Sequence, residues 1–224
     1  MTDSLLYTIA VLGGTGKEGK GLAYRWAKAG YKVIIGSRNA EKAQATAAEL
    51  NELLDGKAAI EGLENLTAAQ KADIAVLTVP YSAHKDTLLG IKDALQGKIL
   101  VDVTVPLVPP KVTKVQMPPA GSAAQEAVEI LGEGVQVVDA FQNISYEHLM
   151  QDGDVPCDVL VTGTSKAARE EVLKLVQAAG LIGWDAGPIE NSSVVEGLTS
   201  ILIYINKQYN TNHAGIKITG ANGH

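Results

Sequence analysis

A glycine-rich turn near the N-terminus constrains the fold of this chain more than any other feature. Residues 14–19 read Gly-Thr-Gly-Lys-Glu-Gly, and they follow a short, continuous apolar run at residues 8–12. Such a run, ended by glycines, is typical of a strand that is buried on both faces of a parallel sheet. The next segment, residues 20–29, places Leu22, Ala23 and Trp26 at helical spacing. The sequence therefore predicts a strand, a tight turn and a helix in succession, as in a doubly wound sheet.

Short apolar runs alternate with helical segments over the first 140 residues. This alternation implies right-handed crossovers and a parallel sheet. Further strands are predicted at residues 32–36, 58–60, 73–79, 98–103 and 136–140. Helices are predicted at residues 39–54, 81–95 and 122–131, and a helix or loop at residues 65–71.

The order of elements changes after residue 140. A strand is predicted at 158–162, a helix at 165–179, a short strand at 181–185, a turn at 185–188, a helix at 193–209 and a loose tail from 211. We therefore expect an α/β fold with two domains. Residues 1–140 form a Rossmann-type doubly wound parallel sheet, and residues 141–224 form a small α+β C-terminal domain.

Charge and cysteine content exclude several classes of partner. The chain of 224 residues has a formal net charge of −6, no long basic run and only 4% aromatic residues, which disfavours nucleic acid and anionic membranes as partners. Its single cysteine, Cys157, has no internal disulfide partner, which fits a reducing compartment, and it is expected as a small buried hydrophobic residue. The first residues have no basic segment and lead straight into a predicted core strand, so we do not expect them to be a signal peptide, and no apolar run approaches the ~18 residues of a membrane span. We expect a soluble cytoplasmic protein.

Each glycine of the turn has a predicted role in binding a dinucleotide. Gly14 permits the tight turn, and Gly16 lets the backbone approach a pyrophosphate with no Cβ in the way. Gly19 allows the helix to pack closely against the strand. The helix N-terminus then offers unpaired N–H groups and the positive end of its dipole to the phosphates. The alternative is a turn without a ligand, which the entropic cost of so many glycines disfavours.

The other residues of the turn complete this candidate site. Thr15 adds a hydroxyl donor, and Lys17 and Glu18 lie between the second and third glycines.

The end of the second predicted strand indicates which nucleotide binds. An acidic residue there hydrogen-bonds the ribose 2′-OH of NAD, whereas this chain has Ser37 and Arg38. A hydroxyl and a guanidinium suit a 2′-phosphate, and Lys42, four residues later, can reach the same group. The alternative is a solvated charged surface. The position beside the glycine-rich turn favours NADP.

Two further strand ends lie where this fold forms its ligand crevice. The first carries Thr78, Val79 and Pro80, and the second carries Val105. Their apolar edges and free carbonyls suit the adenine or nicotinamide side of the nucleotide. Simple termination of each strand by proline is an equal alternative.

Residues for acid–base or metal chemistry are sparse. The sequence contains no zinc-ligand cluster, no nucleophile elbow and no P-loop. Tyr81 and Lys85 follow Pro80 directly and are interpreted as a helix start. His84 is expected on the surface, with a catalytic acid as the less favoured alternative. We assign no catalytic residue and no metal ligand. Direct hydride transfer between two bound cofactors fits this inventory, because the cofactors carry the chemistry.

Several segments together resemble the F420-dependent NADP reductases, from about residue 8 to residue 218. The resemblance is carried by residues 9–16, 36–38, 75–80, 185–188 and 195–199. It implies hydride transfer between NADP(H) and the deazaflavin coenzyme F420, with NADP contacts at Thr15, Ser37, Arg38 and Lys42. It also implies that the deazaflavin stacks over the nicotinamide between the two domains, near residues 79–80, residues 105–107 and Thr199. A homodimer is expected.

The sequence departs from the family pattern at two places. Gln142 stands where a histidine facing the cofactors is typical, and Gly197 replaces a small hydroxyl residue. Both departures are expected on the deazaflavin side of the site. Two other functions therefore stay open at this point: an NADPH-dependent flavin or ferric reductase, and a protein that senses NADP without turnover.

Overall fold

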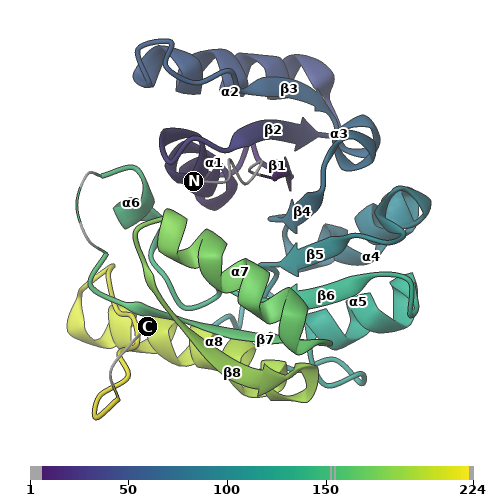
Figure 1. The fold of residues 1–224 in the computed structure, drawn as a ribbon. Helices are drawn as coiled ribbons and strands as arrows, with labels where there is room; N and C mark the ends of the chain where they lie inside the picture. The colour runs from purple at the N-terminus through teal and green to yellow at the C-terminus, as the bar shows by residue number, and fades with distance from the viewer. Residues whose placement is uncertain (1–6, 152, 154, 222–224) are drawn as a thin grey trace.

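A single eight-stranded sheet runs through the molecule, in the order β3-β2-β1-β4-β5-β6-β7-β8 (Figure 1). The computed structural model describes residues 7–151, 153 and 155–221. The strands are β1 (Thr8–Leu12), β2 (Lys32–Ser37), β3 (Glu61–Glu64), β4 (Ile74–Leu77), β5 (Ile99–Asp102), β6 (Gln136–Asp139), β7 (Asp158–Gly163) and β8 (Ile182–Pro188).

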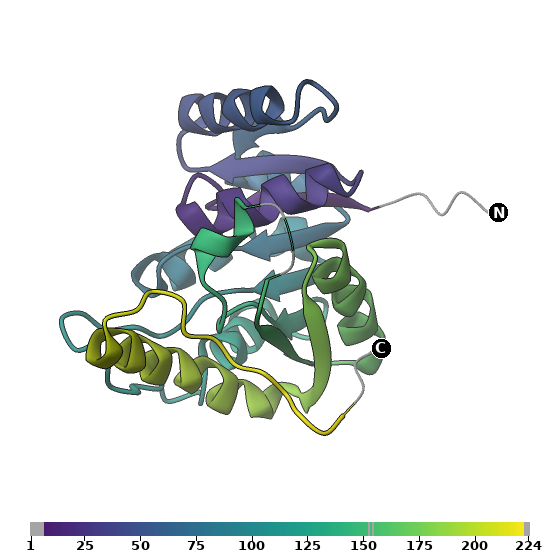
Figure 2. The ribbon, with the colours of Figure 1, turned by 90° about the vertical axis from the view of Figure 1, so that its left-hand side faces the viewer.

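Helices cover both faces of the sheet. They are α1 (Lys17–Lys28), α2 (Ala40–Leu53), α3 (Asn65–Lys71), α4 (Tyr81–Ile91), α5 (Ala123–Leu131), α6 (Tyr146–Leu149), α7 (Lys166–Ala178) and α8 (Ser192–Tyr209), with 3-10 turns η1 (Lys92–Leu95) and η2 (Ile189–Asn191). Figure 2 shows α2 and α8 at opposite ends of the stack of strands.

Alternate residues of the strands face two separate cores. Ile9 and Val11 of β1 pack with side chains of α1, α2 and α7, whereas Ala10 and Leu12 pack with side chains of α3, α4 and α5. Trp26 of α1 is fully buried in the first core, and its indole N–H donates to the Leu175 carbonyl of α7. Both faces of the sheet are thus covered, which explains why its central strands are continuous apolar runs.

The Rossmann-type doubly wound sheet predicted from the sequence is confirmed. Strands β1 to β6 all run parallel to one another. After β6 the direction changes, because β7 is antiparallel to β6 and β8 is parallel to β7. The predicted division at residue 140 falls directly after β6, and the two strands that follow extend the same sheet. That division stays a prediction.

Two local predictions were wrong. The third strand is Glu61–Glu64 and not residues 58–60, because the Asn51 side chain binds both the N–H and the carbonyl of Ile60 and holds that residue in the connection. Residues 185–188 do not form a turn but continue β8, past a register shift opposite residues 161–162. Arg169 holds Asp185 there, with 2.6 Å between Nε and Oδ1.

Two segments contain more order than the sequence indicates. The short helix α6 follows the loop after β6 and packs on α1, where Arg25 donates to the carbonyls of His148 and Leu149. The tail expected to be loose runs beside β7, where Asp158 N–H donates to the Ile216 carbonyl and Ile218 N–H donates to the Asp158 carboxylate, each at 2.8 Å.

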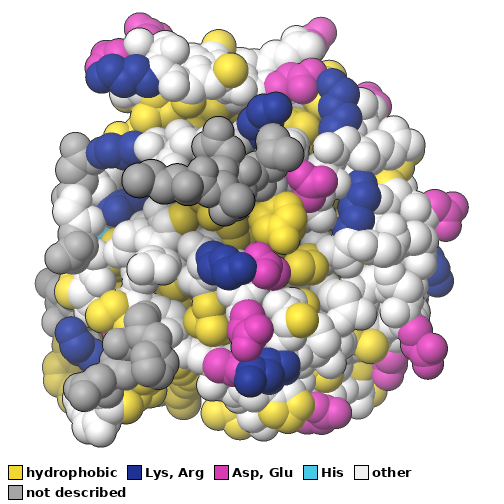
Figure 3. Space-filling model, in the orientation of Figure 1, with side chains coloured by type: hydrophobic (Ala, Val, Ile, Leu, Met, Phe, Trp, Pro, Cys, Tyr) yellow, Lys and Arg dark blue, Asp and Glu magenta, His cyan; other side chains and the backbone are white. Residues whose placement is uncertain are grey.

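No helix in the described part of the chain is long and apolar enough to cross a membrane. On the face drawn in Figure 3, basic and acidic side chains are intermixed, and no broad basic surface is visible there.

Candidate functional site

A cavity of about 830 Å³ lies at the carboxyl ends of the parallel strands. Fourteen cofactor-binding residues are predicted from the sequence, and all except Gly14 line this cavity. The thirteen are Thr15, Gly16, Lys17, Glu18, Ser37, Arg38, Lys42, Thr78, Val79, Pro80, Val105, Gln142 and Thr199. The topology therefore brings together residues that follow three strands (β2, β4 and β5), the glycine-rich turn after β1 and two later segments.

The three glycines of the turn occupy different steric environments. A Cβ on Gly14 would lie 2.6 Å from the Val11 carbonyl, and one on Gly19 would lie 2.4 Å from Thr78 Oγ1. Both positions are closed by the protein itself. A Cβ on Gly16 would meet nothing closer than 3.6 Å, so no protein contact requires glycine there. The space beside Gly16 is therefore open for a ligand to approach the backbone.

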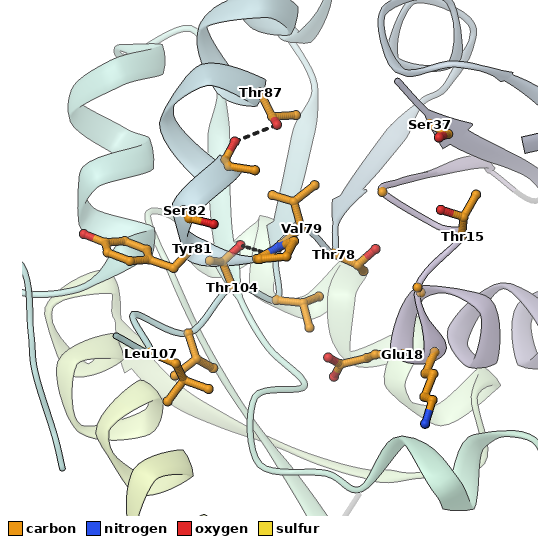
Figure 4. A pocket seen from close by; sticks show the side chains of 18 of the residues that line it. Thr15, Glu18, Ser37, Thr78, Val79, Tyr81, Ser82, Thr87, Thr104 and Leu107 are labelled. Atoms are coloured by element: carbon orange, nitrogen blue, oxygen red, sulfur yellow. Dashed lines mark hydrogen bonds between the residues drawn. The ribbon is translucent and has the colours of Figure 1, made fainter. Parts of the chain in front are cut away.

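The start of α1 is an uncapped helix N-terminus at the cavity wall. Gly16 is the N-cap residue, and no side chain hydrogen-bonds the first-turn N–H groups. Thr15 is exposed beside them, as Figure 4 shows. Free N–H groups and the positive helix end favour an anion such as a phosphate.

Basic groups gather at one end of the cavity, after β2. Arg38 and Lys42 are exposed, and neither side chain forms a hydrogen bond or an ion pair with another described residue. Asn39 caps α2 by accepting from Lys42 N–H, which holds the start of that helix beside Ser37. Two unpaired cations beside a hydroxyl are suited to a phosphate monoester.

The opposite end of the cavity is mainly apolar and follows β4 and β5. Val105 contributes to its wall, together with Val79 and Leu107, which are labelled in Figure 4. Two lining residues were not predicted from the sequence: Thr104 at this apolar end, and Asn65 near the glycine-rich turn. The Asn65 side chain accepts from Gly13 N–H at 3.3 Å, so it braces the glycine-rich turn from α3. The only signal for Thr104 was its place directly after a predicted strand.

Gln142 and Thr199 join two later segments at the cavity. Gln142 is buried, and its Nε2 donates to the Asp102 carbonyl at 2.8 Å and to the Asp139 carboxylate. Thr199 of α8 donates to the Gln142 carbonyl at 2.8 Å. By contrast, Gly197 does not line this cavity, since its nearest side chain is Val115.

His84 is buried, so its expected surface position was wrong. Only 1% of the residue is exposed, and Nε2 lies 2.6 Å from Asp102 Oδ2. Burial lowers the pKa of His84, but the Asp102 carboxylate outweighs this effect and leaves the pKa raised. The residue does not line the cavity, whereas Tyr81 does and opens α4 as predicted. The Asp102–His84 pair fixes the end of β5, because Asp102 Oδ1 also accepts from Thr104 N–H at 3.0 Å.

Glu18 is the one acidic residue among the described residues that line the cavity. Its side chain is half-buried and forms no hydrogen bond or ion pair with another described residue. Burial raises the pKa of the Glu18 carboxyl to about 8. No group of three or more His, Cys, Asp or Glu side chains in the described residues is placed to hold a metal ion.

Two further carboxyls are buried next to Gln142. Burial and the neighbouring Glu196 and Asp102 raise the pKa of Asp139 well above its ordinary value, although the hydroxyls of Ser192 and Thr162 oppose the shift. Burial and Asp102 raise the pKa of Glu196 to about 8, although the N–H groups of Ala123 and Ala124 oppose that shift. Both carboxyls therefore favour the protonated form in the folded state.

These raised pKa values predict that the protein loses stability as pH rises. A carboxyl with a raised folded-state pKa contributes stability below its unfolded pKa and loses it as pH rises toward the folded pKa, by about 1.4 kcal/mol for each pH unit between the two values. We expect the free energy of unfolding in urea to fall between about pH 5 and pH 8, and Asp139→Asn to reduce that fall. The exposed Asp93→Asn is the control. An unchanged slope in Asp139→Asn would contradict the assignment.

Comparison with known proteins identifies close relatives. The family model described as NADP oxidoreductase, coenzyme F420-dependent, matches residues 8–106. The F420-dependent NADP reductase of Methanocaldococcus jannaschii is 41% identical, over 94% of this chain and 97% of the relative. The crystal structure of a putative F420-dependent NADP reductase from Arthrobacter sp. FB24 superposes with a TM-score of 0.79 at 26% identity, over 95% of this chain and 99% of that one. The rat metalloreductase STEAP3 is 26% identical, but the match covers only 35% of its length.

Proposed function

The chain belongs to the F420-dependent NADP reductases, and we propose that it transfers a hydride between NADP(H) and coenzyme F420 in the cavity at the strand ends. The relative from M. jannaschii matches along nearly its whole length, which a shared activity requires. One observation carries the proposal: a single cavity joins an uncapped helix N-terminus and two unpaired cations at one end to an apolar wall at the other. That order of groups follows the order of phosphates and rings in NADP.

The residues present fit NADP. Arg38, Lys42 and Ser37 would hold the 2′-phosphate, and the backbone at Gly16 and the first turn of α1 would hold the pyrophosphate. The nicotinamide would then lie toward Val79 and Val105. The assignment of individual site residues is part of the proposal.

The second substrate would share the apolar end of the cavity. When bound, NADPH supplies a hydride, and the deazaflavin ring of F420 accepts it. The chain orients the two rings through the walls that follow β4 and β5 and through Thr199, which Asn143 fixes by donating to its hydroxyl at 3.2 Å. Gln142 lines the cavity, but its side-chain N–H group already donates to Asp102 and Asp139. A flavin or ferric reductase is less favoured, since the metalloreductase match covers a third of that protein.

The second substrate is tested by the change in absorbance of the deazaflavin. Purified protein with NADPH is expected to bleach F420 and to leave a flavin unreduced under the same conditions, because the chain belongs to a family that is named for F420. Faster reduction of the flavin or of a ferric chelate would reject F420 as the acceptor. Tight NADPH binding with no turnover of any acceptor would favour a sensor.

NADP over NAD selectivity is predicted to depend on Arg38. Arg38→Ala removes a charged donor that only the 2′-phosphate uses, so the dissociation constant of NADPH should rise about tenfold or more while that of NADH stays within about twofold. Fluorescence titration measures both constants. The control is Lys32→Ala, at the opposite end of the same strand. Equal weakening of the two nucleotides would reject this placement of the 2′-phosphate.

We also propose that the protein is a homodimer. On α8, Val194, Ile201 and Tyr204 are each about half exposed or more, at intervals of seven and three residues. The adjoining loop adds the exposed Val115, since Ser200 of α8 donates to the Lys114 carbonyl beside it. An uncovered apolar stripe of this kind suits a second copy of the same helix. The cytoplasm stays the proposed location, because the buried free thiol of Cys157 fits a reducing compartment.

A charge within this stripe is expected to separate the subunits. Ile201→Glu places a carboxylate at the centre of the proposed interface, so light scattering should report a monomer at concentrations where the parent chain is a dimer. The control is Leu66→Glu, which adds the same charge at an exposed apolar residue of α3. A dimer that persists in Ile201→Glu would exclude this face.

A further inference from the structure

Glu18 is placed where the function proposed so far does not require an acid. It is the second residue of α1, and in Figure 4 its carboxylate projects into the open space opposite Thr104 and Leu107. Thr15 and Ser37 lie at the other end of the same view. No described residue forms a hydrogen bond or an ion pair with this carboxyl. It is therefore free to respond to whatever occupies the cavity.

The other charged side chains around the cavity do not point toward Glu18. Lys17 is turned toward α6, where its Nζ donates to the Tyr146 hydroxyl at 3.2 Å and lies 4.9 Å from the ring centre. Across the cavity, the Tyr81 hydroxyl donates to Glu126 at 2.8 Å, and burial with this bond raises the pKa of Tyr81 to about 12. Arg38 and Lys42 belong to the opposite end.

Groups on the neighbouring elements have their own partners. On α6, Glu147 lies 3.7 Å from His213, and the ring of His148 lies against that of His213, with 4.7 Å between centres and 44° between planes. Beyond β4 and β5, His84 and Asp102 are buried as a pair and do not line the cavity. Glu18 is thus the group in the described part of the cavity whose charge can change near neutral pH.

The proposed position of NADP puts this carboxyl beside the nicotinamide. The 2′-phosphate end is set by Arg38, and the pyrophosphate is set by the backbone at Gly16. The nicotinamide then lies past the start of α1, between Glu18 and the wall formed by Val79 and Thr104. This step rests on the proposed function.

We propose that the charge of Glu18 sets the relative affinity of the site for NADP⁺ and NADPH. The oxidised nicotinamide ring carries a positive charge, and the reduced ring is neutral. A carboxylate facing the ring therefore stabilises NADP⁺ and does little for NADPH, whereas a protonated carboxyl loses that preference.

The charge of Glu18 is expected to change at a pH close to neutral. Burial raises the pKa of Glu18 to about 8, and the positive end of α1 opposes this rise. Because NADP⁺ binds the deprotonated form better, its binding lowers that pKa and releases a proton. NADP⁺ therefore binds more tightly as pH rises through the pKa of Glu18, and NADPH does not.

The test is the ratio of the two dissociation constants, Kd(NADP⁺)/Kd(NADPH), measured by titration from about pH 6 to pH 9.5. Both nucleotides carry the same 2′-phosphate, whose pKa is about 6, so its titration cancels in the ratio. We expect the ratio to fall about tenfold with rising pH, as for a charge pair that is partly screened by solvent. Calorimetry at about pH 8, where the 2′-phosphate is already ionised, in buffers of different ionisation enthalpy should show proton release with NADP⁺ and none with NADPH.

Two variants test whether the dependence of this ratio on pH comes from Glu18. Glu18→Gln keeps the shape of the side chain, and we expect it to give a ratio independent of pH and no proton release. Glu147→Gln removes a nearby carboxyl that does not line the cavity, and we expect it to behave like the parent chain. A purely structural role for Glu18 would change both dissociation constants equally and leave the dependence on pH.

The outcomes separate this inference from the proposed function. NADP⁺ and NADPH binding with a constant ratio and no proton release in the parent chain would overturn the role of Glu18 and leave the NADP site standing. The same dependence on pH in Glu18→Gln would overturn it as well. Failure of the parent chain to bind either nucleotide would reject the proposed function, and this inference with it.

Discussion

The close approach of α1 to the end of β4 is the constraint on which the rest of the site depends. Gly19 lies so near Thr78 that a Cβ there would sit 2.4 Å from the threonine hydroxyl oxygen. Thr78 in turn donates to the Leu12 carbonyl at 3.1 Å, which ties the contact to β1. With α1 seated this closely, its uncapped N-terminus opens into the cavity and Gly16 faces free space. The open space beside Gly16 and the position of Glu18 both follow from this one packing contact.

Charged residues near that contact form two groups: one lines the cavity, and the other is buried behind the cavity wall. The surface of the cavity has cations at one end, an apolar wall at the other and a single acid between them among the described residues. Beneath it, Asp102, Asp139 and Glu196 lie buried, with His84 paired to the first. Gln142 contacts both groups, because it lines the cavity and donates to the buried Asp102 and Asp139. The amide donates to the Asp102 backbone carbonyl and to one oxygen of Asp139 without adding a charge.

Features encoded by neighbouring residues could be predicted from the sequence, and features that depend on distant pairs could not. The turn, the helix after it and Arg38 lie within one unit of about thirty residues, and all of them border the cavity. His84 was misplaced because its burial depends on Asp102, on the next strand. The edge strand β3 was missed because it begins and ends with glutamate and lacks an apolar run. No local pattern reveals that Asp185 is held by Arg169, so the end of β8 looked like a turn.

The central claim is that both substrates occupy one cavity, with their rings in contact and no intermediate carrier. The most direct measurement uses NADPH labelled with deuterium at the transferring position of the nicotinamide, with F420 as acceptor in ordinary water. The account predicts that the reduced deazaflavin retains the deuterium on one face of the ring, as direct transfer between stacked rings requires. Reduced F420 that contains only solvent hydrogen would contradict it, because the hydrogen would then have passed through an exchanging group.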